Sequence, residues 1–138
     1  MADPVHLLLD TEEIKRLKAR YFRCLDTKDW PGLADVFAAD ATLEAEGRVR
    51  RGRDEIVGMI AKVLNGVVSV HHGHMPEITV TSADTATGVW AMFDYLEFPT
   101  DPPSGFRGYG HYEEEYVREG GTWLIKRLVL TRIRVDNF

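Results

Sequence analysis

The feature that most constrains the fold is a change of residue pattern at Asn65-Gly66. Before it, apolar residues recur at helical spacing, which predicts helices over 10–27, from Trp30-Pro31 onwards and over 53–64, with a strand at 41–46. After it, β-branched and aromatic residues dominate the segments 67–72, 77–81, 85–98, 108–118 and 122–135, which predicts a run of strands. Helices followed by long antiparallel strands indicate an α+β fold, with the helices on one face of a strongly curved sheet.

The length of 138 residues suits one compact domain spanning 1–138. A strongly curved antiparallel or mixed sheet that is closed by helices forms a cone-shaped barrel with a central pocket, and its mouth is a natural ligand site. The segment 99–105 holds three prolines and is expected to be an exposed loop over the end of the sheet.

The first predicted helix places a carboxylate beside its apolar face. Asp10 is the expected N-cap, and Glu13 three residues later fits a capping box. Tyr21 belongs to the apolar stripe, and Asp26 lies at its border near the helix end. Because the helix dipole disfavours a carboxylate there, Asp26 is a candidate for a role other than helix formation.

Charge and composition exclude several classes of partner. Lys and Arg number 17 against 22 Asp and Glu, a net charge of −5, which argues against a nucleic-acid surface despite the local basic run Arg48, Arg50, Arg51 and Arg53. No apolar stretch approaches the ~20 residues needed to span a bilayer, so no membrane partner is expected. The acidic N-terminal segment does not resemble a signal peptide, and the single cysteine, Cys24, favours a reducing, cytoplasmic compartment.

Three of the five histidines cluster in Val70-His71-His72-Gly73-His74. A metal site is one interpretation, but adjacent strand residues point to opposite faces, and no further ligand set accompanies them. Surface or structural histidines are another. The third is a single inward histidine that acts as a general base, since an ordinary imidazole pKa of about 6.5 suits work near neutrality.

The other candidate residues each have an ordinary structural interpretation. Asp26 could orient a histidine base or face solvent, and Tyr21 could donate a hydrogen bond to substrate or only fill the core. Asp94 lies inside an apolar strand segment, where the pattern alone slightly favours a solvent-facing side chain over a site. Arg132 and Arg134 share one face of the last strand, and either could neutralise a carboxylate or a substrate anion.

Taken together, these residues resemble a known family. The string Ile14-Lys15-x-Leu17-Lys18-x-x-Tyr21-Phe22-Arg23-Cys24-Leu25-Asp26-x-Lys28-x-Trp30 closely resembles the start of the bacterial bile-acid 7α-dehydratases. The string His71-x-Gly73-His74-x-Pro76-Glu77-Ile78-Thr79, the later Asp94 and Arg132-Ile133 extend the likeness over about 14–134. More broadly, the chain resembles the SnoaL-like domains of the cystatin-like α+β-barrel group, which includes scytalone dehydratase, hexachlorocyclohexane dehydrochlorinase and ketosteroid isomerase.

The resemblance implies an active site made of Tyr21, Asp26, His71, Asp94 and Arg132, with an Asp26–His71 pair as its acid-base centre. It implies a lyase that removes water from a steroid-like or other polycyclic hydroxy-ketone without cofactor or metal. A homo-oligomer, with a trimer preferred, is expected by the same resemblance.

Two alternatives stay open at this stage. One is a non-catalytic module of the same fold that binds a small apolar ligand or serves in assembly. The other is an isomerase or dehydrohalogenase that uses the same base. The general-base aspartate of ketosteroid isomerase has no match here, because Ala45 stands at that position between Glu44 and Glu46.

Overall fold

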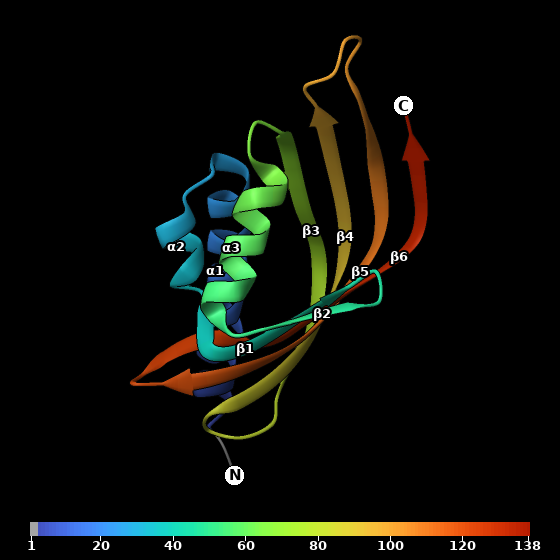
Figure 1. Cartoon of the computed structure of the whole chain (residues 1–138). Coiled ribbons are helices and arrows are strands. Elements are labelled where there is room, and N and C mark those ends of the chain that lie inside the picture. Colours follow the sequence, from blue (N-terminus) through green and yellow to red (C-terminus); the bar gives the residue numbers. More distant parts are fainter. Residues whose placement is uncertain (1–2) are drawn as a thin grey trace.

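The structure is a computed structural model that describes residues 3–138 and combines three helices with six strands (Figure 1). The elements, in chain order, are α1 (Pro4–Thr27), α2 (Trp30–Ala34), β1 (Phe37–Ala45), β2 (Arg48–Arg51), α3 (Arg53–Leu64), β3 (Val68–Val80), β4 (Thr85–Phe98), β5 (Ser104–Glu119) and β6 (Thr122–Asn137). The predicted α+β class is confirmed.

The six strands form one sheet in the order β2-β1-β6-β5-β4-β3. Only the β1–β6 pair is parallel, so the sheet is mixed and its last strand in sequence lies in its interior. The sheet curves around the three helices, which all lie on its concave side (Figure 1). Buried residues such as Ile14, Leu33, Phe37, Ile56 and Ile125 fill the space between the two layers.

The first helix begins earlier than predicted. Asp3 caps it by accepting a hydrogen bond from the Val5 backbone N–H at 3.0 Å, and Pro4 occupies the first helical turn. The prediction that Asp10 caps this helix was wrong. Asp10 is buried within α1 and accepts hydrogen bonds from Arg118 at 2.8 and 3.0 Å. Its carboxylate forms an ion pair with a residue 108 positions away in the sequence, and rules based on local sequence cannot predict such a contact.

Several strand boundaries also differ from the prediction. The two segments expected at 67–72 and 77–81 form one strand, β3, whose register against β4 shifts between Gly73 and Pro76. β1 begins at Phe37, and β5 begins at Ser104, which shortens the expected loop. β2 was not predicted, because its four residues appeared only as a basic run.

The turn that precedes β2 explains why so short a strand forms. Glu46 and Gly47 both adopt positive φ, at 52° and 75°, and join β1 to β2 as a two-residue hairpin. Positive φ at both positions gives the turn a twist that matches the flanking strands. No helix in the described part of the chain is long and apolar enough to cross a membrane.

Candidate active site

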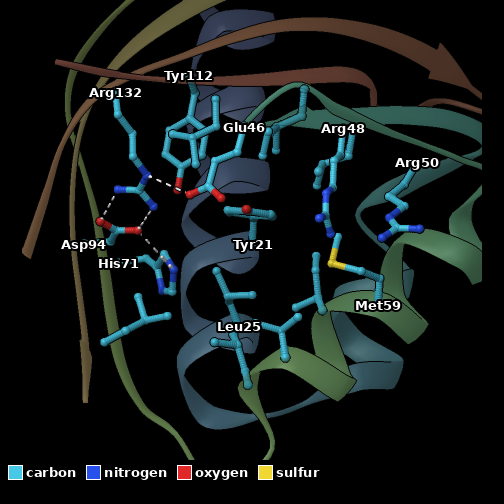
Figure 2. Close-up of a pocket in the computed structure, with 18 of the residues that line it drawn as sticks. Tyr21, Leu25, Glu46, Arg48, Arg50, Met59, His71, Asp94, Tyr112 and Arg132 are labelled. Atoms are coloured by element: carbon cyan, nitrogen blue, oxygen red, sulfur yellow. Dashed lines mark hydrogen bonds and ion pairs between the residues drawn. The ribbon is translucent and has the colours of Figure 1, made fainter. Parts of the chain in front are cut away.

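A cavity of about 360 Å³ lies between the helices and the concave face of the sheet. Most of its wall is apolar and comes from α1, α3 and all six strands, with Leu25, Ile60 and Phe106 among the lining residues. Four of the five predicted site residues, Tyr21, His71, Asp94 and Arg132, also line it (Figure 2). The fifth, Asp26, lies behind His71 and contacts it directly.

The pair of His71 and Asp26 has the geometry of an oriented base. Nδ1 of His71 lies 2.7 Å from Oδ1 of Asp26, and the backbone N–H of His71 donates to Oδ2 at 2.8 Å. Ser69 adds a third bond to the same carboxylate, at 3.3 Å. Because a carboxylate at Nδ1 holds the proton on that nitrogen, Nε2 is left as the basic atom. The last turn of α1 and the inward face of β3 thus assemble an acid-base pair from positions 45 residues apart.

Asp94 and Arg132 form a second pair beside His71. The two guanidinium Nη atoms of Arg132 donate to the two carboxylate oxygens of Asp94 at 2.8 and 2.7 Å. This corrects the pattern-based preference for a solvent-facing Asp94, which is only 2% exposed because the bidentate partner compensates its burial. Nε2 of His71 lies 3.9 Å from Oδ2 of Asp94, beyond hydrogen-bond distance but close enough for electrostatic interaction. Arg134, the other candidate, is exposed and bonds Asp136.

The absence of a side chain at Gly108 leaves the space that this ion pair occupies. Gly108 faces Asp94 across the β4–β5 pair, and a Cβ at position 108 would come within 1.8 Å of Nη1 of Arg132 and 2.2 Å of Oδ1 of Asp94. Nε of Arg132 has no hydrogen-bond partner among residues 3–138, and Oε1 of Glu46 is 3.8 Å away. The hydrogen bonds to Asp94 raise the pKa of the Arg132 guanidinium, which keeps it charged.

Tyr21 contributes a protonated hydroxyl to the cavity. It lies on the buried face of α1, packed edge-on against Tyr112 of β5 with ring centroids 6.0 Å apart. Burial, and secondarily the charge of Glu114, raise the pKa of Tyr21 above its ordinary value, and burial does the same for the pKa of Tyr112. Both phenols therefore remain hydrogen-bond donors throughout the neutral range.

A buried ion pair behind the two tyrosines was missed by the sequence interpretation. Nζ of Lys18 lies 3.7 Å from the ring centroids of both Tyr21 and Tyr112, and it donates to Oε2 of Glu114 at 2.6 Å. Neither the Lys18 nor the Glu114 side chain is exposed, and Tyr116 donates to Oε1 of Glu114 at 2.7 Å. Burial lowers the pKa of Lys18 to about 8. The spacing of Lys18 from Ile14 placed it on the apolar stripe, which was the signal available in the sequence.

The buried tyrosines predict a specific alkaline response. The pKa values of Tyr21, Tyr112 and Tyr116 are raised, chiefly by burial, above an ordinary value near 10. The folded state thus holds these protons more tightly than the unfolded state, so the stabilisation is complete below pH 10 and is lost as the pH rises beyond it. We expect part of the tyrosinate absorbance at 295 nm to appear only together with loss of near-ultraviolet circular dichroism. Full ionisation of the tyrosines with an intact dichroism spectrum would contradict this.

The three clustered histidines do not point to one site. His71 lines the cavity, whereas His72 and His74 are exposed, with their rings 6.4 Å apart. Within residues 3–138, no group of three His, Cys, Asp or Glu side chains is arranged to hold a metal ion. The alternation along β3 therefore separates His71 from the rest of the motif and assigns it to the cavity.

Comparison with known proteins places this chain in a family. The fold is shared with a scytalone dehydratase-like protein of Novosphingobium aromaticivorans, at 22% identity and a TM-score of 0.87 over 95% of this chain and 89% of that one. A hexachlorocyclohexane dehydrochlorinase matches at 19% identity and a TM-score of 0.89, over 99% and 93%. A protein of unknown function from Mycobacterium tuberculosis matches at 27% identity and a TM-score of 0.82, over 96% of this chain and 77% of that one. A family model described as the SnoaL-like domain matches residues 6–129, and the chain therefore belongs to the SnoaL-like family.

Proposed function

We propose that this protein is a hydro-lyase that eliminates water from a hydrophobic, ring-containing hydroxy-ketone, with a steroid of the type handled by bile-acid 7α-dehydratases as the preferred substrate. The observation that supports the proposal best is the His71–Asp26 pair, whose Nδ1–Oδ1 distance of 2.7 Å leaves Nε2 free at an apolar cavity. The likeness to a scytalone dehydratase-like protein and to a dehydrochlorinase supports an elimination in which a base removes a proton from carbon.

The proposed reaction gives each donor and acceptor of the site a role. Nε2 of His71 removes a proton from a carbon that a conjugated carbonyl makes acidic, and the C–H electron pair moves into an enolate. Tyr21 donates a hydrogen bond to the enolate oxygen as negative charge develops there. The carbon–oxygen bond to the leaving hydroxyl then breaks, and Nε2–H of His71 supplies the proton that completes a water molecule. No electrons are gained or lost overall, so the step needs no redox cofactor.

Asp94 and Arg132 set the charge around this base. Both oxygens of Asp94 accept from Arg132, an arrangement that suits the ionised carboxylate and leaves His71 as the acid for the leaving group. The carboxylate, 3.9 Å from Nε2, stabilises the imidazolium that forms after proton removal. Arg132 limits this effect, because it neutralises most of the charge on Asp94.

An ultraviolet assay tests the proposed function. A 7α-hydroxy-3-oxo-4-ene steroid that loses water gains a conjugated double bond, so its absorbance shifts to longer wavelength, and mass spectrometry confirms the loss of water. Saturable binding without turnover would contradict the lyase and favour a binding module. Turnover of a chlorinated ring compound in place of the steroid would assign the same base to dehydrohalogenation, as the dehydrochlorinase likeness suggests.

We also propose that the protein is a homo-oligomer, with three copies preferred. In support, large apolar side chains stand exposed on the sheet, including Ile133 at 76%, Val135 at 42% and Val89 at 40%. Exposed apolar side chains on a sheet favour burial against another chain. Light scattering at micromolar concentration is expected to give about three times the monomer mass of 15.7 kDa. A monomer under these conditions would refute the assembly.

A further inference from the structure

The arginines of the basic run do not form one surface, because β2 divides them by face. Arg50 pairs with Leu43 and Arg48 pairs with Ala45 in the antiparallel β1–β2 register. Opposed residues of an antiparallel pair point to the same side of the sheet, and Leu43 and Ala45 both line the cavity. Arg48 and Arg50 therefore face the cavity, and they too line it.

The remaining arginines of the run have other positions. Arg51 pairs with Thr42, and alternation turns it away from the cavity. Arg53 donates through Nε to the backbone oxygen of Phe37 at 3.1 Å, which ties the start of α3 to β1. The division by face leaves two arginines at the cavity and supplies Arg51 as a matched outward control.

The two inward arginines are poorly neutralised by the protein itself. Among residues 3–138, no carboxylate lies within 4 Å of Arg48, and Arg50 reaches Glu55 only at 3.8 Å. The nearest acidic residue in sequence, Glu46, lies 3.8 Å from Arg132. The cavity lining thus holds three arginines against two carboxylates, and one of these carboxylates, Asp94, is fully engaged by Arg132. The cavity lining therefore carries an excess of positive charge, although the chain as a whole has a net charge of −5.

The position of these arginines relative to the base defines what a ligand must carry. Figure 2 shows Arg48 and Arg50 on the side of the cavity away from His71 and Asp94, near Met59 of α3. β2 is an edge strand of the sheet, so its inward side chains lie at the rim. Between rim and base the wall is mostly apolar. A ligand that spans the cavity is therefore apolar in its body and anionic at the end remote from the reacting carbon.

We propose that Arg48 and Arg50 form an anion subsite that binds a carboxylate at the remote end of an apolar substrate. Two guanidinium groups with few internal partners suit a carboxylate, which accepts charge-assisted and bidentate hydrogen bonds. Only the identity of the apolar body rests on the proposed function; the preference for negative charge does not. The subsite fixes the orientation of the substrate, because it holds the charged end at the rim and directs the uncharged rings toward His71 and Tyr21.

A binding experiment tests the subsite apart from catalysis. The probes are 3-oxo-4-cholenoate and its methyl ester, which share the apolar body, differ in charge and lack a leaving hydroxyl. Calorimetric titration of the native chain is expected to give a dissociation constant about 10- to 100-fold lower for the carboxylate than for the ester. The preference is expected to shrink as the salt concentration rises.

Charge-removing variants locate the preference. The double variant Arg48→Gln/Arg50→Gln is expected to bind the carboxylate and the ester alike, with ester affinity unchanged, and each single variant is expected to lose part of the preference. Arg51→Gln is expected to keep all of it. Equal affinity for the two probes in the native chain, failure of both to bind, or an equal loss for both in the double variant would overturn the subsite. If no steroid is turned over but the charge preference holds, the proposed lyase fails and the subsite stands.

Discussion

Replacing His71 by alanine is expected to lower kcat for elimination by at least about 10³-fold, with a much smaller change in KM. His71 supplies both the base for the carbon-bound proton and the acid for the leaving hydroxyl, so its loss removes two proton transfers at once. The apolar wall and the arginines that bind substrate remain in place. Steady-state kinetics in the ultraviolet assay, with circular dichroism to confirm folding, measures the effect.

Two further variants separate catalysis from a general disturbance of β3. His72→Ala changes the adjacent, exposed histidine and is expected to leave kcat unchanged. Asp26→Asn keeps the shape of the orienting side chain but permits the wrong imidazole tautomer, so a loss of roughly 10²- to 10⁴-fold is expected. Near-native elimination by His71→Ala would disprove the mechanism, and near-native elimination by Asp26→Asn would remove Asp26 from it.

Replacing Lys18 by methionine is expected to lower the free energy of unfolding by about 3–5 kcal/mol. Methionine fills a similar volume and keeps the contacts with the rings of Tyr21 and Tyr112, but it leaves Glu114 buried without its cation. Urea denaturation followed by tryptophan fluorescence measures the change. This is expected to be the largest loss of stability among the polar substitutions considered, because both partners are wholly shielded from water.

The double variant Lys18→Met/Glu114→Gln isolates the electrostatic part of that loss. Glutamine can still accept a hydrogen bond from Tyr116 without carrying a charge, so most of the lost stability is expected to return. If the double variant is as unstable as Lys18→Met alone, the loss comes from packing, and the ion pair has no special weight.

The elements with strong periodicity were predictable from sequence. The helix over 53–64 and the strand over 85–98 have the predicted bounds, because each carries a long unbroken pattern bounded by turn residues. The start of α1 was not predictable in the same way. Asp10 looks like a cap in local sequence, but its carboxylate is engaged by Arg118, which lies on a distant strand. β2 was missed because four residues are too few to show a period.

The candidate site was predictable only in part, for a related reason. Helical spacing placed Tyr21 inward, and alternation along the strand predicted that His71 and His72 point to opposite faces. The choice of His71 as the inward histidine came from the family resemblance and not from the pattern. The buried position of Asp94 did not follow from pattern. Burial of a carboxylate is favourable only with a charged partner, and the partner, Arg132, lies 38 residues away in the sequence. Lys18 was overlooked because a lysine on an apolar stripe is normally taken as solvated, and its compensating glutamate is 96 residues distant.

The interior position of β6 has a consequence for how this protein is made in the cell. β1 and β5 both pair with β6, so the sheet is two separate pieces while β6 is still inside the ribosome. Arg132 belongs to that same strand, and until it emerges the carboxylate of Asp94 has no cation to accompany it into the core. Until β6 emerges, the nascent chain therefore exposes the unpaired edges of β1 and β5, and such edges are open to pairing with other chains until β6 covers them.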